Sequence, residues 1–145
     1  MNKIILILFT FILSGCIGLA HPEGSSMFPS VQNGDYLLQV YYPTNIKRGD
    51  IISFKNDKII YLKRVIGLPG EIVSFRWKVV SVNGLAINEP YIAIRTEYEN
   101  SFIVLGRDEY YVMGDNRADS TDSRSLGPIN KKDIISKCLF RIWRY

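Results

Sequence analysis

A serine and a lysine in this sequence, Ser26 and Lys63, are of the residue types that can cooperate in nucleophilic catalysis. A serine hydroxyl is a poor nucleophile until a base removes its proton. A lysine can be that base only when it is neutral, so burial must lower its pKa from about 10.4 to about 7–8. Each residue also has an ordinary explanation: a serine in a turn, and a lysine on the surface of an edge strand.

The sequence around Lys63 offers a place where a lysine could lose its hydration. Residues 58–66 are rich in β-branched and aromatic side chains and predict a strand. In such a strand Tyr61, Lys63 and Val65 share one face, and Arg64 points to the other. Lys63 could then be buried without a second cation beside it.

A polar segment, residues 114–124, is a further candidate part of a site. Because it is rich in Asp, Asn, Arg and Ser, it is either a solvated loop or a network that holds a lysine in one rotamer. The single histidine, His21, lies next to a proline and is interpreted as a loop residue rather than a base. Cys16 and Cys138 lack the spacing of metal ligands, so no metal or cofactor is expected, and a disulfide between them stays open.

The elements that position these residues are predicted to be strands. Asn83-Gly84 favours a tight hairpin, residues 89–100 are mixed, and no long amphipathic helix is expected after the N-terminus. We therefore expect residues 21–145 to form a mainly β domain, an all-β barrel or sandwich. The predicted strands are residues 36–42, 50–54, 58–66, 71–75, 78–82, 85–88, 101–105, 109–113 and 134–143.

Composition limits the classes of function. The 145 residues suit one domain, and 47% of them are hydrophobic, which excludes a disordered chain. The formal net charge is +4, with Lys and Arg spread along the sequence. This pattern favours a solvated surface, so no nucleic-acid partner is expected.

The N-terminus predicts export. Lys3 is followed by an uncharged stretch, residues 4–20, close to the shortest helix that crosses a bilayer. Residues 1–20 are therefore interpreted as a membrane anchor, with the rest of the chain outside. Two alternatives stay open: a lipoprotein signal ending at Cys16, and a signal peptide cut after Ala20.

Four segments in this order resemble the type I signal peptidases, membrane-bound endopeptidases with a Ser–Lys dyad. The resemblance covers nearly the whole exported part and implies the fold of that family after one N-terminal hydrophobic helix. It also implies removal of signal peptides from secreted preproteins, on the outer face of a membrane whose lipid the enzyme contacts. The matching segments are residues 23–29, 48–51, 61–71 and 114–124, with smaller matches at 83–84, 89–91 and 140–143.

The resemblance also implies roles for individual residues. Ser26 attacks the scissile carbonyl, its backbone N–H helps to stabilise the oxyanion, and Lys63 is the general base. Met27 and Pro29 shape the turn that carries the nucleophile. Ser120 orients the lysine amine.

In the same segment Asp122 and Arg124 would form an ion pair behind the amine, and Asp115 would belong to the same network. The sequence departs from the family at Gly24, where some members carry a serine that donates a second hydrogen bond to the oxyanion. The large extra β domain of some members is also absent. Two rival interpretations remain: a sister Ser–Lys peptidase that matures a pilin in conjugation, and a non-catalytic exported lipoprotein.

Overall fold

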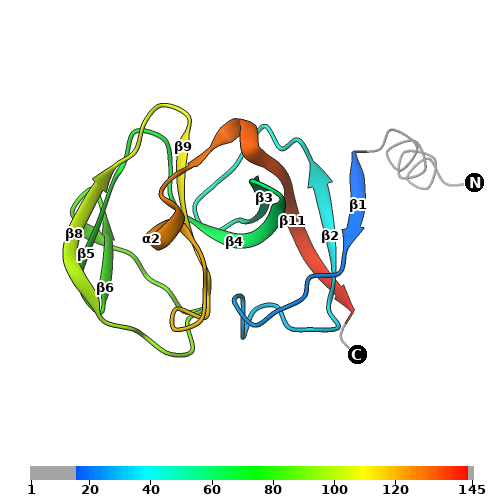
Figure 1. The fold of residues 1–145 in the computed structure, drawn as a ribbon, viewed down its shortest axis with the longest axis horizontal. Helices are drawn as coiled ribbons and strands as arrows, with labels where there is room; N and C mark the ends of the chain where they lie inside the picture. The colour runs from blue at the N-terminus through cyan, green and yellow to red at the C-terminus, as the bar shows by residue number, and fades with distance from the viewer. Residues whose placement is uncertain (1–15, 144–145) are drawn as a thin grey trace, which may run out of the picture.

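The computed structural model describes residues 16–143, which form two antiparallel sheets (Figure 1). The larger sheet has the strand order β1-β2-β11-β3-β4-β9-β10, and the smaller sheet has the order β7-β6-β5-β8. The expected mainly β domain is confirmed. The strands are β1 (Ile17–Ala20), β2 (Tyr36–Tyr41), β3 (Ile51–Asn56), β4 (Ile59–Gly67), β5 (Ile72–Trp77), β6 (Val79–Val82), β7 (Leu85–Ala86), β8 (Tyr98–Val104), β9 (Glu109–Met113), β10 (Ile129–Asn130) and β11 (Ile134–Trp143).

Local sequence predicts the turn at Asn83-Gly84 correctly but not the start of strand β8. Asn83 and Gly84 join β6 to β7 with positive φ angles of 50° and 80°, the backbone that a two-residue hairpin of this type requires. The strand predicted at residues 101–105 instead begins at Tyr98 in β8. It is longer because Tyr98 pairs with Trp77 beyond an irregularity in the β5–β8 ladder, a long-range contact that sequence pattern does not reveal.

The N-terminal segment differs from the expected boundary at residue 20. Residues 1–15, which hold most of the predicted anchor, lie outside the described residues. Ile17–Ala20 form β1, which pairs with β2 at the edge of the larger sheet because β2 would otherwise leave its backbone groups unpaired on that side. Within residues 16–143 no helix is both long and apolar enough to cross a membrane.

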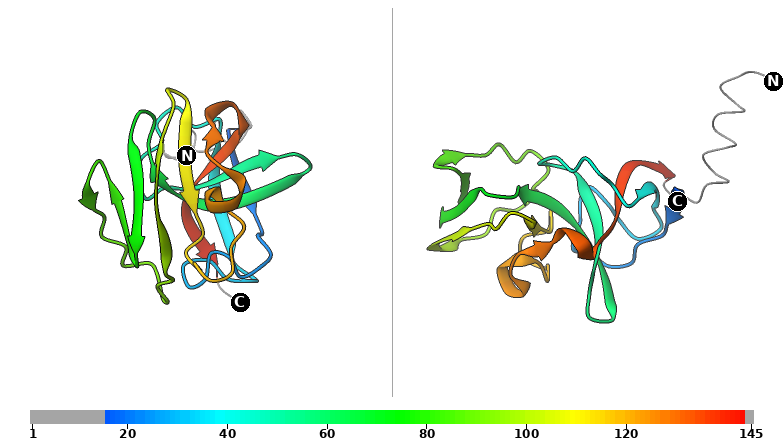
Figure 2. Two further views of the ribbon diagram at one scale, coloured as in Figure 1. Left: turned by 60° about the vertical axis from the view of Figure 1, so that its left-hand side comes forward. Right: turned by 90° about the horizontal axis from the view of Figure 1, so that it is seen from above.

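The hydrophobic core joins the two sheets. Ile66 of β4 and Met113 of β9 belong to the larger sheet, yet they pack with Val73 and Phe75 of the smaller sheet. Gly67 ends β4 at the crossing, where an added Cβ would lie 2.5 Å from a methyl carbon of Val73. The smaller sheet is therefore fixed to the strand that carries Lys63. Figure 2 shows the hairpin of β3 and β4 projecting from the body of the molecule.

Candidate active site

The nucleophile candidate lies in the connection between β1 and β2. Met27 is buried with Val31 and Leu37, and the N–H of Val31 donates to the carbonyl of Met27 at 2.9 Å. The peptide bond between Phe28 and Pro29 is cis. Because Met27 anchors this turn in the core, the neighbouring Ser26 is held at the wall of a cleft.

The base candidate lies on β4, where Lys63 pairs with Ile52 of β3. Its side chain is only 3% exposed. Lys63 Nζ lies 2.7 Å from Ser26 Oγ and donates a hydrogen bond to the carbonyl of Leu62 at 2.8 Å. Burial lowers the pKa of Lys63 from 10.5 to about 8, and the charges of Asp122 and Asp115 oppose that change without cancelling it. The amine therefore touches the hydroxyl and is neutral at mildly alkaline pH.

Arg64, the next residue on β4, points away from the dyad. Its guanidinium binds both carboxylate oxygens of Asp115, at 2.8 and 2.6 Å, and donates to the carbonyl of Gly49 at 2.7 Å. It also stacks over the ring of Tyr91. The alternation expected for this strand thus separates the buried amine from its neighbouring cation.

The polar segment after β9 folds into a compact network rather than a solvated loop. Asp122 is fully buried and caps the four-residue helix α2 (Ser123–Leu126). Burial would raise the pKa of Asp122, but hydrogen bonds from Arg124 and from the N–H of Gly114 lower it below its ordinary value. Asp122 is therefore an anion that faces the lysine.

Ser120 lies in the same segment and lines the cleft together with Lys63. Its Oγ is buried close to Asp122, whose pKa it helps to lower, but it makes no hydrogen bond of good geometry to another described residue. The hydrogen bonds of Lys63 go to Ser26 and Leu62, so the predicted contact between Ser120 and the lysine amine is not formed here. An unpartnered hydroxyl beside the dyad is available to a substrate or to the amine in another rotamer.

The cleft has a volume of about 620 Å³ and runs between the β1–β2 connection and β4. Ile59 and Ile60, at the tip of the β3–β4 hairpin, form one apolar wall and are more than half exposed. Within residues 16–143, no group of three or more His, Cys, Asp or Glu side chains could hold a metal ion. Cys16 and Cys138, both described, are not bonded to each other.

Comparison with known proteins identifies the family of the chain. Residues 2–143 match the model of a protein family described as "Signal peptidase, peptidase S26". The chain belongs to the signal peptidase family. It is 37% identical over 134 residues to a signal peptidase I of Bacillus amyloliquefaciens, an alignment that covers 81% of this chain and 69% of the relative. It is 35% identical over 133 residues to signal peptidase I S of Bacillus subtilis (strain 168), covering 81% and 72%.

A solved structure of a signal peptidase I from Enterococcus faecalis V583 has the same fold. Its TM-score is 0.57 at 26% identity, and the match covers 69% of this chain and 98% of that chain. The resemblance to the signal peptidase family that the four sequence segments indicated is thereby confirmed. Signal peptidases I are serine-type, membrane-associated peptidases.

Gly24, where the sequence departs from the signal peptidase pattern, also has an unusual backbone conformation. Gly24 has φ of +102°, a backbone that favours glycine, and its N–H donates to Asn33 Oδ1 at 2.7 Å. The hydroxyl of the next residue, Ser25, donates to Asp119 Oδ2 at 2.5 Å. Both polar groups next to Ser26 are therefore engaged in holding the turn.

Residues outside the predicted site also belong to the network. Arg117 is buried, and its guanidinium binds the carboxylate of Glu89, the hydroxyl of Tyr98 and the carbonyl of Gly114. Arg117 lies within the fourth matching segment and Glu89 within a smaller one, so the signal was present. Sequence alone did not reveal that the two residues meet, because they are 28 positions apart.

Gly114 offers a direct test of how closely the polar segment packs on the nucleophile turn. A Cβ added there would lie 2.5 Å from the carbonyl oxygen of Ser26 and against Ser120 Oγ. We expect Gly114→Ala to lower the free energy of unfolding by about 1–3 kcal/mol, because overpacking forces the backbone to move. Displacing Ser26 should also lower the cleavage rate roughly tenfold or more.

Thermal unfolding and cleavage kinetics would be compared with Gly106→Ala as the matched control. At Gly106 an added Cβ meets only the flexible side chain of Glu109, at 3.1 Å or more. Equal activity in the two variants would contradict close packing of the polar segment on the nucleophile.

Proposed function

We propose that this chain is a membrane-bound serine endopeptidase that removes N-terminal signal peptides from exported preproteins, with Ser26 as nucleophile and Lys63 as general base. The observation that carries the proposal is the buried contact of 2.7 Å between Lys63 Nζ and Ser26 Oγ. With a pKa of about 8, about a tenth of the lysine is neutral at pH 7 and about half at pH 8. Membership of the signal peptidase family supports the assignment.

In the proposed reaction Ser26 Oγ attacks the scissile carbonyl carbon while Lys63 Nζ takes the hydroxyl proton. The oxyanion faces the backbone N–H of Ser26. The lysine ammonium then gives its proton to the leaving amine, which releases the mature protein and leaves the signal peptide as an ester of Ser26. Lys63 next takes a proton from water, whose oxygen attacks the ester carbonyl. The lysine ammonium then returns a proton to Ser26 Oγ, and the signal peptide leaves with a free carboxyl group.

The surrounding residues support these steps. Met27 and Pro29 shape the nucleophile turn, and Ser120 orients the amine when it swings between hydroxyl and leaving group. The ion pair of Arg124 with Asp122 holds the polar segment against the dyad. Asp115, paired with Arg64, fixes the start of that segment.

The proposal also places the cleft at a membrane surface. Residues 4–20 carry no charge, and Ser26 follows them after only five residues. Ile59 and Ile60, which line the cleft, and Leu19, which precedes the cleft-lining Ala20, are apolar and each more than half exposed. These side chains would contact lipid while a preprotein delivers its cleavage site.

Cleavage of a preprotein by the purified full chain in detergent or vesicles tests this function. The substrate should carry alanine at the first and third positions before the cut, and mass spectrometry of both products should place one cut after the first of these. Replacing the alanine next to the cut by leucine should lower kcat/KM roughly a hundredfold or more, because misplacing the scissile bond loses orientation. No cleavage, or cleavage that ignores this residue, would contradict the proposal.

A further inference from the structure

Glu89 lies outside the cleft but at the centre of the buried charges that surround the polar segment. It lies in the connection between β7 and β8, which belong to the smaller sheet, and it does not line the cleft. Its side chain is 1% exposed and forms an ion pair with Arg117, whose side chain is fully buried. Burying both charges is costly unless each is fully paired, so this pair has to be held in one geometry.

We propose that Glu89 is a positioning residue of the peptidase, which holds the polar segment against the Ser26–Lys63 dyad through Arg117. The inference rests on the proposed function. If Glu89 has this role, the smaller sheet contributes to the reaction although it supplies no side chain to the dyad.

The path from Glu89 to the dyad is a chain of direct contacts. The carboxylate binds the guanidinium of Arg117, and Arg117 Nε donates to the carbonyl of Gly114 at 3.0 Å. The N–H of Gly114 donates to Asp122 at 2.9 Å, and its Cα packs against the backbone of Ser26. Each contact restrains the one that follows it, so a loose Arg117 would loosen Gly114 and the residues on both sides of it.

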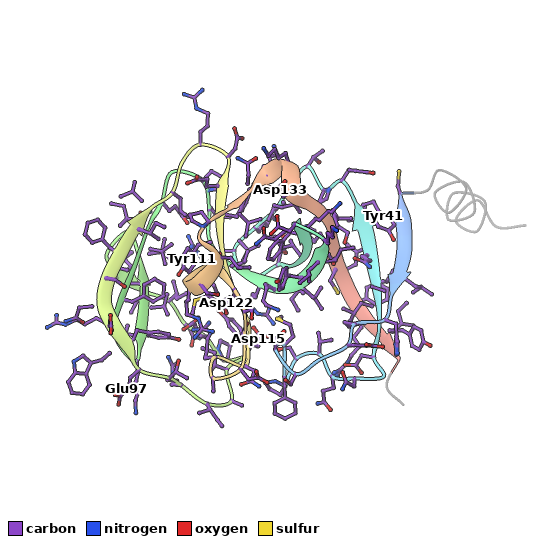
Figure 3. All side chains as sticks on the ribbon, in the orientation of Figure 1. Tyr41, Glu97, Tyr111, Asp115, Asp122 and Asp133 are labelled. Atoms are coloured by element: carbon purple, nitrogen blue, oxygen red, sulfur yellow. The ribbon has the colours of Figure 1, made fainter. Side chains whose placement is uncertain are left out.

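A second path reaches the same segment from its other side. Tyr91 donates to Glu89 Oε1 at 3.1 Å, and its ring lies 4.1 Å beneath the guanidinium of Arg64. Arg64 in turn binds Asp115, the residue that follows Gly114. Figure 3 labels Asp115 and Asp122, which lie close together between the two sheets. Glu89 is therefore connected to two adjacent residues of the polar segment: to Gly114 through Arg117, and to Asp115 through Tyr91 and Arg64.

The charge of Glu89 also has an electrostatic consequence for the dyad. Among the described residues, the charged or titratable groups that interact with the Glu89–Arg117 pair are Arg95, Tyr91, Tyr98, Tyr111 and Arg124. With the carboxylate neutralised, the charge of Arg117 would stand uncompensated in the interior. An unpaired buried charge is costly, so Arg117 would shift and its contact with Gly114 would loosen.

Lys63 would respond through the polar segment, whose two buried carboxylates act on its amine. The anions that favour its charged form are Asp122 and Asp115, and the ring of Tyr61 lies 5.7 Å from its Nζ. A loosened polar segment would move these two carboxylates away from the amine and weaken that stabilisation. The acid limb of the cleavage rate should therefore move to lower pH, which a loss of stability alone would not cause.

The test compares Glu89→Gln with wild type and with Glu71→Gln. Glutamine keeps the size and one acceptor oxygen of Glu89 but removes its charge. Glu71 is the control because it also pairs with an arginine, Arg48, at 2.6 Å, and among the described residues neither side chain hydrogen-bonds directly to residues 114–124. The measured quantities are the thermal midpoint and the pH profiles of kcat and KM for one preprotein.

For Glu89→Gln we expect kcat on the alkaline plateau to fall roughly tenfold, with KM within about twofold of wild type. The acid limb should lie at lower pH. For Glu71→Gln we expect a lower thermal midpoint with unchanged kcat and an unchanged acid limb. A folded Glu89→Gln enzyme with the kcat and acid limb of wild type overturns the inference, and so does an equal loss of kcat in Glu71→Gln.

If Glu89→Gln does not fold, Tyr98→Phe decides. It removes only the hydroxyl that accepts from Arg117 at 2.8 Å. A fall in kcat at constant KM supports the positioning of the polar segment through Arg117, and an unchanged kcat overturns it. Wild type that cleaves no preprotein contradicts the proposed function itself, whereas active wild type with active, unshifted variants contradicts only the role of Glu89.

Discussion

Lys63→Met is expected to abolish cleavage while making the protein more stable. Methionine fills a similar volume but cannot accept the proton of Ser26, which lies 2.7 Å from the amine. Loss of a general base and of the activated nucleophile should lower kcat/KM at least about a thousandfold. The measurement is steady-state cleavage of a preprotein at pH 8.

The stability gain follows from the pKa of the buried amine. Burial lowers this pKa from 10.5 to about 8, so at neutral pH the folded protein holds a proton that the interior disfavours. The difference corresponds to about 3 kcal/mol that opposes folding below pH 8 and fades as pH rises toward 10.5. Lys63→Met removes this penalty, and the free energy of unfolding at pH 7 should rise by about 1–3 kcal/mol.

The controls separate chemistry from structure. Ser26→Ala should be equally inactive, and the double variant should be no worse than either single one, because the two residues act as a unit. Ser26→Ala should not gain the stability of Lys63→Met, since its lysine is still buried. Retained activity in Lys63→Met, or additive losses in the double variant, would rule out the dyad.

The second large effect is on pH. The cleavage rate should fall about tenfold for each pH unit below about 8, so that kcat/KM at pH 6 is about a hundredfold below its plateau. The sign follows from the base: protonation below its pKa removes the lone pair that accepts the serine proton. A carboxylate base would instead keep the rate constant down to about pH 5.

The profile is best measured as kcat/KM, which reports the free enzyme. Circular dichroism at each pH should show a folded protein throughout, so that the decline reports titration and not unfolding. A rate that stays flat between pH 8 and pH 6 would mean that Lys63 is not the base.

Much of the fold was predictable because the strands carry their pattern locally. Alternation around Lys63 placed it and Arg64 on opposite faces, and the Asn83-Gly84 dipeptide predicted a hairpin that the structure contains. The start of β8 at Tyr98 and the strand β1 were not predicted. Both depend on pairing with distant strands, which a short window of sequence does not contain.

The residues of the candidate site could be predicted from the sequence, but most of the ion pairs between them could not. Order of segments along the sequence indicated which residues to consider, but not which carboxylate meets which guanidinium. The sequence suggested a pair between Asp122 and Arg124, which the structure contains. It gave no sign that Arg117 would leave its own segment and pair with Glu89, because buried ion pairs between distant segments leave no periodic pattern.

The strand order of the larger sheet has a consequence for when activity can arise. β1 and β2 flank the turn that carries Ser26, and β4 carries Lys63, but β11 lies between β2 and β3. The two halves of the dyad are thus bridged by β11, which follows all the other described strands in the sequence. If Ser26 and Lys63 are the catalytic pair proposed above, a nascent chain would not bring them together before β11 has been inserted, and it would stay inactive until then.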